Sequence, residues 1–254
     1  CESITGLTLP STVNSIGIYA FSDCASLTSF SIPSGVPKVP EGCFAGCESL
    51  VIATIPDSVS EIGERAFYNC YKLSMTSIPA SVRFIGDYAY YGCSELITAA
   101  VPSGVTNIGS WTFGHCASLQ TISIGGNTEF IAPYAFYGCA GLENVHFGGT
   151  YAKWDSLALM DDNEALNNAT LHTSDYGTIV GHSSCGDNVT WILDGNGNLM
   201  IKGSGNMYDY DSETVNDELI IVEAYVLRSR CSCPQSVFAL GHLIAYATNT
   251  QQDC

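Results

Sequence analysis

A hydrophobic pattern with a fixed period of 23 residues occupies the first 147 positions. Each copy opens with a cysteine, followed by an apolar residue at the third position and another at the eighth. An aromatic residue lies three positions before every cysteine after the first. A fixed period without insertions is typical of stacked coils that bury their apolar edges against one another. The cysteines are Cys1, Cys24, Cys47, Cys70, Cys93, Cys116 and Cys139, and the aromatic residues are Phe21, Phe44, Phe67, Tyr90, Phe113 and Phe136.

Within one copy, the pattern predicts a short strand. Leu27, Phe30 and Ile32 place apolar side chains at nearly alternating positions, which suits a strand with one buried face. Pro33 follows and has no N–H to donate, so we expect the strand to end there. The cysteines should then form a column of buried thiols, since free cysteine behaves as a small hydrophobe.

A glycine and an Ala-Phe pair predict how each coil turns back toward the start of the next copy. A glycine just after an aliphatic residue predicts a sharp turn with a left-handed backbone. The following Ala-Phe pair predicts a short helical turn whose ring enters the core. The glycines concerned are Gly17, Gly63, Gly86 and Gly109.

The unit Ile-Gly-x-x-Ala-Phe-x-x-Cys-x-x-Leu-x-x-x-x-Ile-Pro-x-x-Val resembles the BspA-like class of leucine-rich repeats over residues 1 to about 150. The resemblance implies a β-rich α/β leucine-rich-repeat solenoid of parallel stacked strands and short helical turns. It also implies an extracellular or cell-surface location, roles in adhesion or ligand binding, and no catalytic residues. The sequence departs from the pattern at Cys43, which replaces the alanine, at Pro40, which replaces the glycine, and at the small residues Ala53, Thr76 and Ala99.

The pattern predicts four parts. Residues 1–147 form the solenoid, and residues 148–173 form a C-terminal cap, because a terminal repeat needs an atypical polar face. Residues 174–210 form a linker and a small β-hairpin module whose turn is rich in Gly and Asn, and residues 211–254 are unassigned. The cap and the module also resemble segments that close or separate such repeat arrays. Since the chain begins inside a repeat, we expect any signal peptide to lie outside this fragment.

The charge of the chain excludes two classes of partner. It has 25 acidic and 8 basic residues and a net charge of −17. Nucleic acids and anionic membranes are bound mainly through Lys and Arg, so we expect neither. The sequence has no apolar run of about 20 residues, so we expect no membrane-spanning segment in it.

The remaining cysteines do not predict a metal site or cofactor. Their spacing lacks the paired Cys-x-x-Cys arrangement of zinc sites, which favours disulfides or unpaired thiols in a poorly ordered tail. Asp194 begins a stretch like a calcium loop, but Leu199 and Gly205 occupy positions that need glycine and glutamate, so a hairpin turn is favoured. The residues considered for zinc are Cys231, Cys233, His242 and Cys254, with His182 and Cys185.

The sequence predicts no enzyme. Its histidines belong to no local motif, and adjacent residues such as His115 and Cys116 usually point apart. Paired acids such as Asp161 and Asp162 are expected in solvated loops. No nucleophile with a base and no phosphate-binding loop is recognised.

One face of the strands is a candidate binding surface. Residues five and seven positions after each cysteine should point outward, and they are small, uncharged and rich in hydroxyls. This composition suits either a plain β surface or a docking face for an extended partner or a glycan. The candidate binding residues are Ser29, Ser31, Ile52, Thr54, Met75, Ser77, Thr98, Thr121 and Ser123.

These observations predict a non-catalytic, secreted or cell-surface bacterial protein whose solenoid binds a protein or glycan partner. The alternative is a passive spacer or an accessory region of a larger surface enzyme. The predicted structural ladder consists of Cys24, Cys47, Cys70, Cys93, Cys116 and Cys139 with Phe21, Phe44, Phe67, Phe113 and Phe136.

Overall fold

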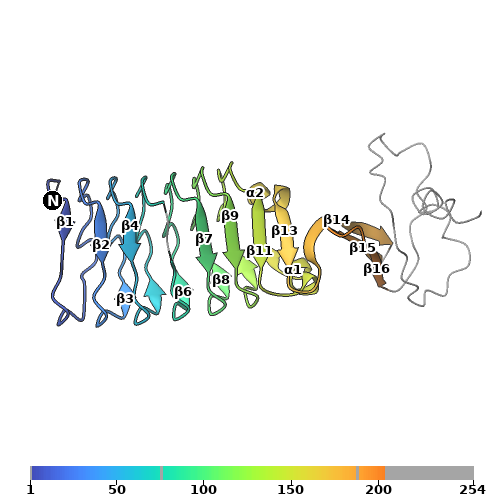
Figure 1. Cartoon of the computed structure of the whole chain (residues 1–254), viewed down its shortest axis with the longest axis horizontal. Coiled ribbons are helices and arrows are strands. Elements are labelled where there is room, and N and C mark those ends of the chain that lie inside the picture. Colours follow the sequence, from blue (N-terminus) through green and yellow to red (C-terminus); the bar gives the residue numbers. More distant parts are fainter. Residues whose placement is uncertain (1, 75–76, 187–188, 204–254) are drawn as a thin grey trace, which may run out of the picture. The chain divides into compact units, whose positions relative to one another are not determined.

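The computed structural model describes residues 2–74, 77–186 and 189–203 (Figure 1). The chain divides into two compact units, Cys1–Asp175 and Tyr176–Cys254. The predicted unassigned part, residues 211–254, lies outside the described residues. Each unit is described below by itself.

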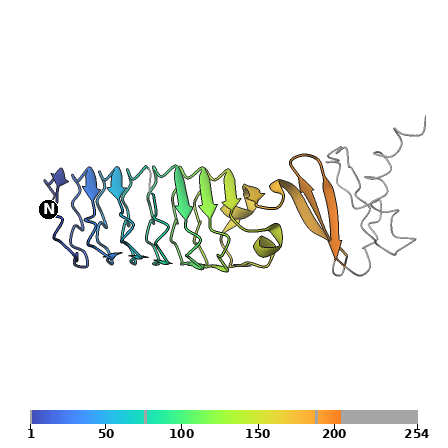
Figure 2. The same cartoon turned by 60° about the horizontal axis from the view of Figure 1, so that its bottom comes forward.

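The first unit is a solenoid of parallel strands whose coils stack side by side (Figures 1 and 2). Strands of successive coils form a first stack, in which residues 23 apart are partners, as in Gly6 with Ser29 and Ser29 with Ile52. The strands of this stack are β1 (Gly6–Leu7), β2 (Ser29–Ser31), β4 (Ile52–Thr54), β7 (Thr98–Val101), β9 (Thr121–Ile124), β11 (Asn144–Phe147) and β13 (Thr170–Thr173).

A second stack of very short parallel strands lies further along the coils, and from β3 to β8 each of its strands follows the proline of its coil. It has the same register of 23 residues, as in Lys38 with Glu61 and Glu61 with Phe84. The sequence analysis predicted only one strand per coil. The second stack consists of β3 (Lys38–Val39), β5 (Glu61–Ile62), β6 (Phe84–Ile85), β8 (Asn107–Ile108), β10 (Phe130–Ile131) and β12 (Ala158–Leu159).

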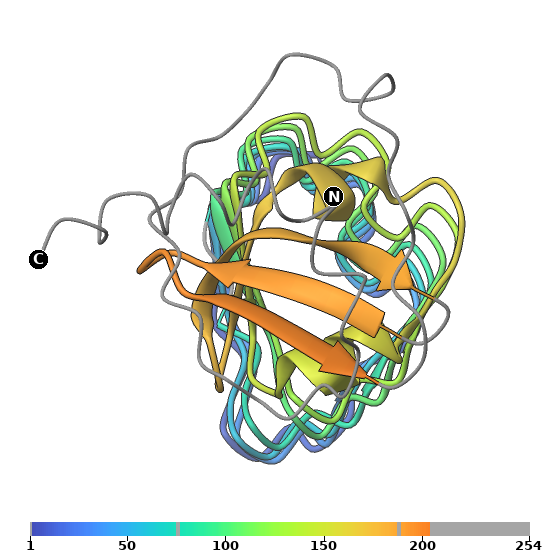
Figure 3. The same cartoon turned by 90° about the vertical axis from the view of Figure 1, so that its right-hand side faces the viewer.

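The coils superimpose when viewed along the stack (Figure 3). Because they repeat in register, each core side chain packs against the side chain at the same position of the next coil. The aromatic column of Phe21, Phe44, Phe67, Tyr90, Phe113 and Phe136 has neighbouring ring centroids 5.1 to 5.5 Å apart in nearly parallel planes. Every ring in it is buried except Phe21, which is half-buried.

The cysteine column lies beside these rings and is buried from Cys24 to Cys139. Each thiol from Cys47 onward donates to the backbone carbonyl of the aromatic residue 26 positions earlier, for example Cys116 Sγ to Tyr90 O at 3.2 Å. The thiols are therefore hydrogen-bond donors between coils as well as small apolar groups. Burial raises the pKa of Cys139 to about 12 and that of Cys93 well above its usual range.

The Ala-Phe segment forms a run of six turn residues in place of a regular helix. Its fourth and sixth amides donate to the next coil, as from Phe113 N to Ala135 O at 2.8 Å and from His115 N to Tyr137 O at 2.7 Å. In an α-helix these amides would instead donate to carbonyls four residues earlier in the same segment, and they could not bond to the next coil. The second and sixth residues of each run have positive φ, at a cost of about 1–2 kcal/mol for each non-glycine residue. They are Tyr19, Asp23, Gly42, Gly46, Arg65, Asn69, Tyr88, Gly92, Trp111, His115, Tyr134 and Gly138.

The left-handed backbone predicted at Gly17, Gly63, Gly86 and Gly109 is wrong, because none of these glycines has positive φ. A different constraint acts at Gly63 and Gly86, where the backbone of the preceding coil leaves no room for a side chain. A Cβ on Gly63 would lie 2.6 Å from Glu41 N, and one on Gly86 would meet the backbone of Glu64. Glycine is therefore needed there for close approach of the coils.

Residues 148–175 contain both strands of a further, longer coil. β12 pairs with β10 and β13 with β11, at register steps of 28 and 26 residues. The segment before β12 is five residues longer than in the preceding coil and contains the short helix α1 (Tyr151–Asp155), whereas the segment between β12 and β13 contains α2 (Glu164–Asn168). Just before α2, the buried Asn163 replaces part of the next coil: its Oδ1 accepts from Phe136 N at 2.9 Å and its Nδ2 donates to Ala132 O at 3.0 Å.

The second unit contains an antiparallel meander of β14 (Gly177–Gly186), β15 (Val189–Asp194) and β16 (Leu199–Gly203). Much of the predicted linker is thus the strand β14. In the turn between β15 and β16, the Asp194 carboxylate accepts from Asn196 N at 2.9 Å, Asn198 N at 2.8 Å and Asn198 Nδ2 at 2.8 Å. These bonds, led by the one from the Asn198 side chain, lower the pKa of Asp194 and explain a hairpin turn at this sequence.

Replacing Gly86 with alanine tests the close approach of the coils. Gly86→Ala should lower the free energy of unfolding by about 1–3 kcal/mol, because the preceding backbone must move. Gly17→Ala is the matched control: a Cβ there meets nothing within 4 Å, so the change should be neutral or stabilising by about 0.4–1 kcal/mol. Urea unfolding of both variants measures the difference, and equal midpoints would contradict the steric explanation.

The thiol column predicts loss of stability in mild alkali. Unfolded thiols ionise near about pH 8.5, whereas burial raises the pKa of the folded ones, so the unfolded state loses protons first as the pH rises. Each fully buried thiol should therefore lower the free energy of unfolding by about 1.4 kcal/mol per pH unit above about 8.5. Urea midpoints under reducing conditions at pH 7.5 and 9.5 measure this fall. It should be smaller in Cys93→Ala/Cys116→Ala, and an equal fall in that variant would refute the assignment.

Candidate binding face

The predicted outward residues lie exposed on the first stack of strands. In β2 and β4 the central residue is buried while its neighbours are exposed, and in β7 exposed and buried residues alternate from Thr98 onward. Ile52 is 54% exposed. Met75 lies outside the described residues. The face formed by the other predicted positions, named here the outer strand face, comprises Ser29, Ser31, Ile52, Thr54, Ser77 and Thr98, which are exposed, and Thr121 and Ser123, which are half-buried.

The parallel register aligns these residues into two columns. Ser29 is the partner of Ile52 in one column, and Ser31 is the partner of Thr54 in the other. Thr98 is likewise the partner of Thr121. The structure thus brings the predicted residues of neighbouring coils together in the sheet, and their role in binding stays a prediction.

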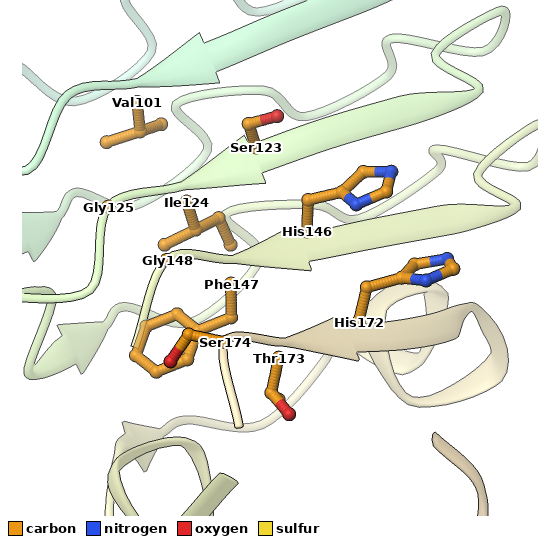
Figure 4. A pocket seen from close by; sticks show the side chains of 10 residues that line it. All are labelled: Val101, Ser123, Ile124, Gly125, His146, Phe147, Gly148, His172, Thr173 and Ser174. Carbon is orange, nitrogen blue, oxygen red and sulfur yellow. The ribbon is translucent and has the colours of Figure 1, made fainter. Parts of the chain in front are cut away.

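Near its C-terminal end, the first unit has a hollow of about 440 Å³ along the ends of β9, β11 and β13. Figure 4 shows Ser123, His146 and His172 projecting from neighbouring strands beside it. Apolar groups, including Ile124 and Phe147, line the hollow with Gly125 and Gly148. This end combines an apolar recess with ring nitrogens and hydroxyls, which is the usual composition of a binding site.

His146 and His172 form a pair that sequence analysis did not find. They are register partners in β11 and β13, and their rings stack with centroids 4.3 Å apart. His172 Nε2 lies 3.0 Å from Asn144 Oδ1. Burial, and then the nearby charge of protonated His146, lower the pKa of His172. The two residues are 26 positions apart, so the 23-residue period gave no sign of their contact.

The structure places the other chemical candidates apart. The exposed ring of His115 stacks on Trp111, whereas the Cys116 thiol is buried and donates to Tyr90 O. Within the described ranges, no three His, Cys, Asp or Glu residues gather where they could hold a metal ion. The same ranges contain no helix that is long and apolar enough to cross a membrane. Cys231, Cys233, His242 and Cys254 lie outside them.

The strand stacks, buried cysteine column and exposed sheet face define a leucine-rich-repeat solenoid. The family model described as BspA type Leucine rich repeat region matches this chain in six copies, over residues 1–94 and 60–176. The chain therefore belongs to the BspA-type leucine-rich repeat family. None of the curated proteins matches the chain significantly.

Solved bacterial structures share the fold. The leucine-rich repeat protein TpLRR of T. pallidum is 26% identical, with a TM-score of 0.54 over 67% of this chain and 85% of that chain. The pneumococcal vaccine antigen PcpA is 19% identical, with a TM-score of 0.54 over 64% of this chain and 41% of its own. Both similarities support the solenoid described above.

The histidine pair predicts an NMR titration. His172 should titrate below about pH 6.5, because its burial and the charge of His146 both oppose protonation. Since the unfolded state then takes up the proton first, this group's contribution to stability is present above about pH 6.5 and is lost as the pH falls. In His146→Gln the midpoint of His172 should rise. A midpoint at or above 6.5 in the unaltered chain would be inconsistent with the described pair.

Proposed function

We propose that this protein is a non-catalytic, secreted or surface-associated binding protein that uses the outer strand face to bind a protein or glycan partner. The carrying observation is that the described outward positions form aligned columns without a charged side chain, although the net charge is −17. A partner can cover such a face without burying an unpaired charge. Its short Ser and Thr side chains also lose little rotamer freedom on binding.

Two further observations support this proposal. Ile52 offers an exposed apolar contact among hydroxyl-bearing neighbours, which resembles the mixture of apolar and polar groups in ordinary interfaces. The similarity to PcpA, a pneumococcal vaccine antigen, supports a location at the bacterial surface. A passive spacer would have the same fold but no affinity for a partner.

A charge on the outer strand face should weaken binding without unfolding the chain. Ile52→Asp should lower the affinity for the partner by at least about tenfold, because the new carboxylate would be desolvated in the interface. Phe84→Asp is the matched control, since Phe84 is 55% exposed but lies on the second stack of strands, in β6. Both variants should keep the melting temperature of the parent.

The measurement is surface plasmon resonance against purified extracellular-matrix proteins, together with a glycan array. A partner that binds the parent and Phe84→Asp but not Ile52→Asp would support the outer strand face. A partner equally affected by both changes, or no partner at all, would reject it, and the second result favours the spacer.

A further inference from the structure

Seven aromatic side chains gather on another side of the solenoid, within four consecutive runs of turn residues. These runs follow the second strand of each coil and precede the next first strand, so they are separate from the outer strand face. Trp111 lies at the centre, parallel within 7° to Tyr88 at 6.1 Å and to Tyr134 at 4.7 Å between centroids. The residues of this aromatic ridge are Tyr68, Tyr88, Tyr91, Trp111, His115, Tyr134 and Tyr137.

The turns do not need these rings. Tyr88, Trp111, His115 and Tyr134 all have positive φ, where a side chain strains the backbone. At equivalent positions other coils have glycine, as at Gly42. Strained residues of this kind concentrate at functional sites, which makes the ridge a candidate for one.

The way the rings stack selects the kind of partner. Tyr88, His115 and Tyr134 lie nearly parallel to Trp111, while Tyr91 and Tyr137 meet it edge-on. A sugar ring would stack on an open aromatic face, whereas the Trp111 ring is already flanked by parallel rings of the protein. The ridge offers ring edges instead, and Tyr137 is 41% exposed. Rigid Tyr and Trp groups of this kind are enriched in interfaces with proteins, because little side-chain entropy is lost there.

The charges around the ridge are complementary to a basic partner. The four runs that carry the ridge contain two carboxylates, Glu64 and Asp87, against one guanidinium. A third carboxylate, that of Asp162, accepts a hydrogen bond from the Tyr134 phenol and raises its pKa. That guanidinium, on Arg65, is already paired with Glu64 and lies 5.1 Å from the centroid of the Tyr88 ring. Asp87 Oδ1 accepts from Ser110 N at 2.8 Å, so this carboxylate is bonded to the residue that precedes Trp111.

We propose that the aromatic ridge is a docking surface for a basic segment of a partner protein. Arg and Lys side chains would lay their alkyl stems on the ring edges and donate to Asp87, Glu64 and the phenol oxygens. Association would be steered by the negative charge of the chain, and specificity would come from the fixed rings. This surface is independent of the outer strand face.

The test removes rings but no charges. In Tyr68→Ala/Tyr91→Gly/Tyr137→Ala, two rings are replaced by the residue that Ala45 provides at the same turn position and one by the residue that Gly114 provides. The probe is a fluorescein-labelled ten-residue peptide of alternating arginine and alanine, followed by anisotropy in 150 mM NaCl. The triple variant should bind at least tenfold more weakly than the parent. The control Phe84→Ala removes an exposed ring from β6, outside the ridge and the outer strand face, at the same net charge, and it should bind as the parent does.

Equal affinity of the parent and the ring-deleted variant would overturn the proposal, because the peptide would then respond to net charge alone. Absence of binding to the parent would also overturn it, as would a glycan whose binding depends on the same three tyrosines. A shift of the Trp111 indole N–H signal on adding peptide, assigned by its loss in Trp111→Gly, would support contact at the ridge, and an unmoved signal would count against it. Unchanged melting temperatures show that each variant is folded.

Discussion

Hydrogen bonding between successive coils is the constraint on which the solenoid depends. Each coil must lie within backbone hydrogen-bonding distance of the next, at the spacing of about 4.8 Å that parallel strands share. The side chain at one position is consequently a neighbour of the same position in the next coil. This geometry puts phenylalanine on phenylalanine and thiol beside thiol, and it leaves no space for a side chain at Gly63 or Gly86. The core columns, the turns and both surfaces follow from it.

The same constraint explains how much the sequence could predict. The first strand, the aromatic column and the buried cysteines repeat at one period, and one-dimensional periodicity is enough to place them. The second strand, such as Lys38–Val39, has two residues and too little alternation to be recognised. The sequence analysis explained Gly63 by a left-handed backbone. A sequence does not distinguish a glycine that is needed for its conformation from one that is needed because the backbone of the preceding coil leaves no room for a Cβ.

The candidate sites depended less on the period. The outward positions of the first strand followed from simple alternation, whereas the contact of His146 with His172 required the longer last coil. The ridge was missed for another reason: its positions vary from coil to coil, with Gly42 equivalent to Tyr88, and a consensus pattern treats them as spacers. Variable positions on an invariant scaffold are where a repeat protein can carry specific chemistry.

Asn163 has a consequence for the molecule as a whole. Its side-chain amide can both accept and donate, as a peptide group does: Oδ1 accepts from Phe136 N, and Nδ2 donates to Ala132 O of the same regular coil. Without it, Phe136 N would remain an unpaired donor. In the regular coils the equivalent amide, such as Phe113 N, donates to a carbonyl of the next coil. Such an open end would accept a coil of another molecule as readily as one of its own, and copies would add end to end into fibres. A single buried amide thus opposes polymerisation at this turn.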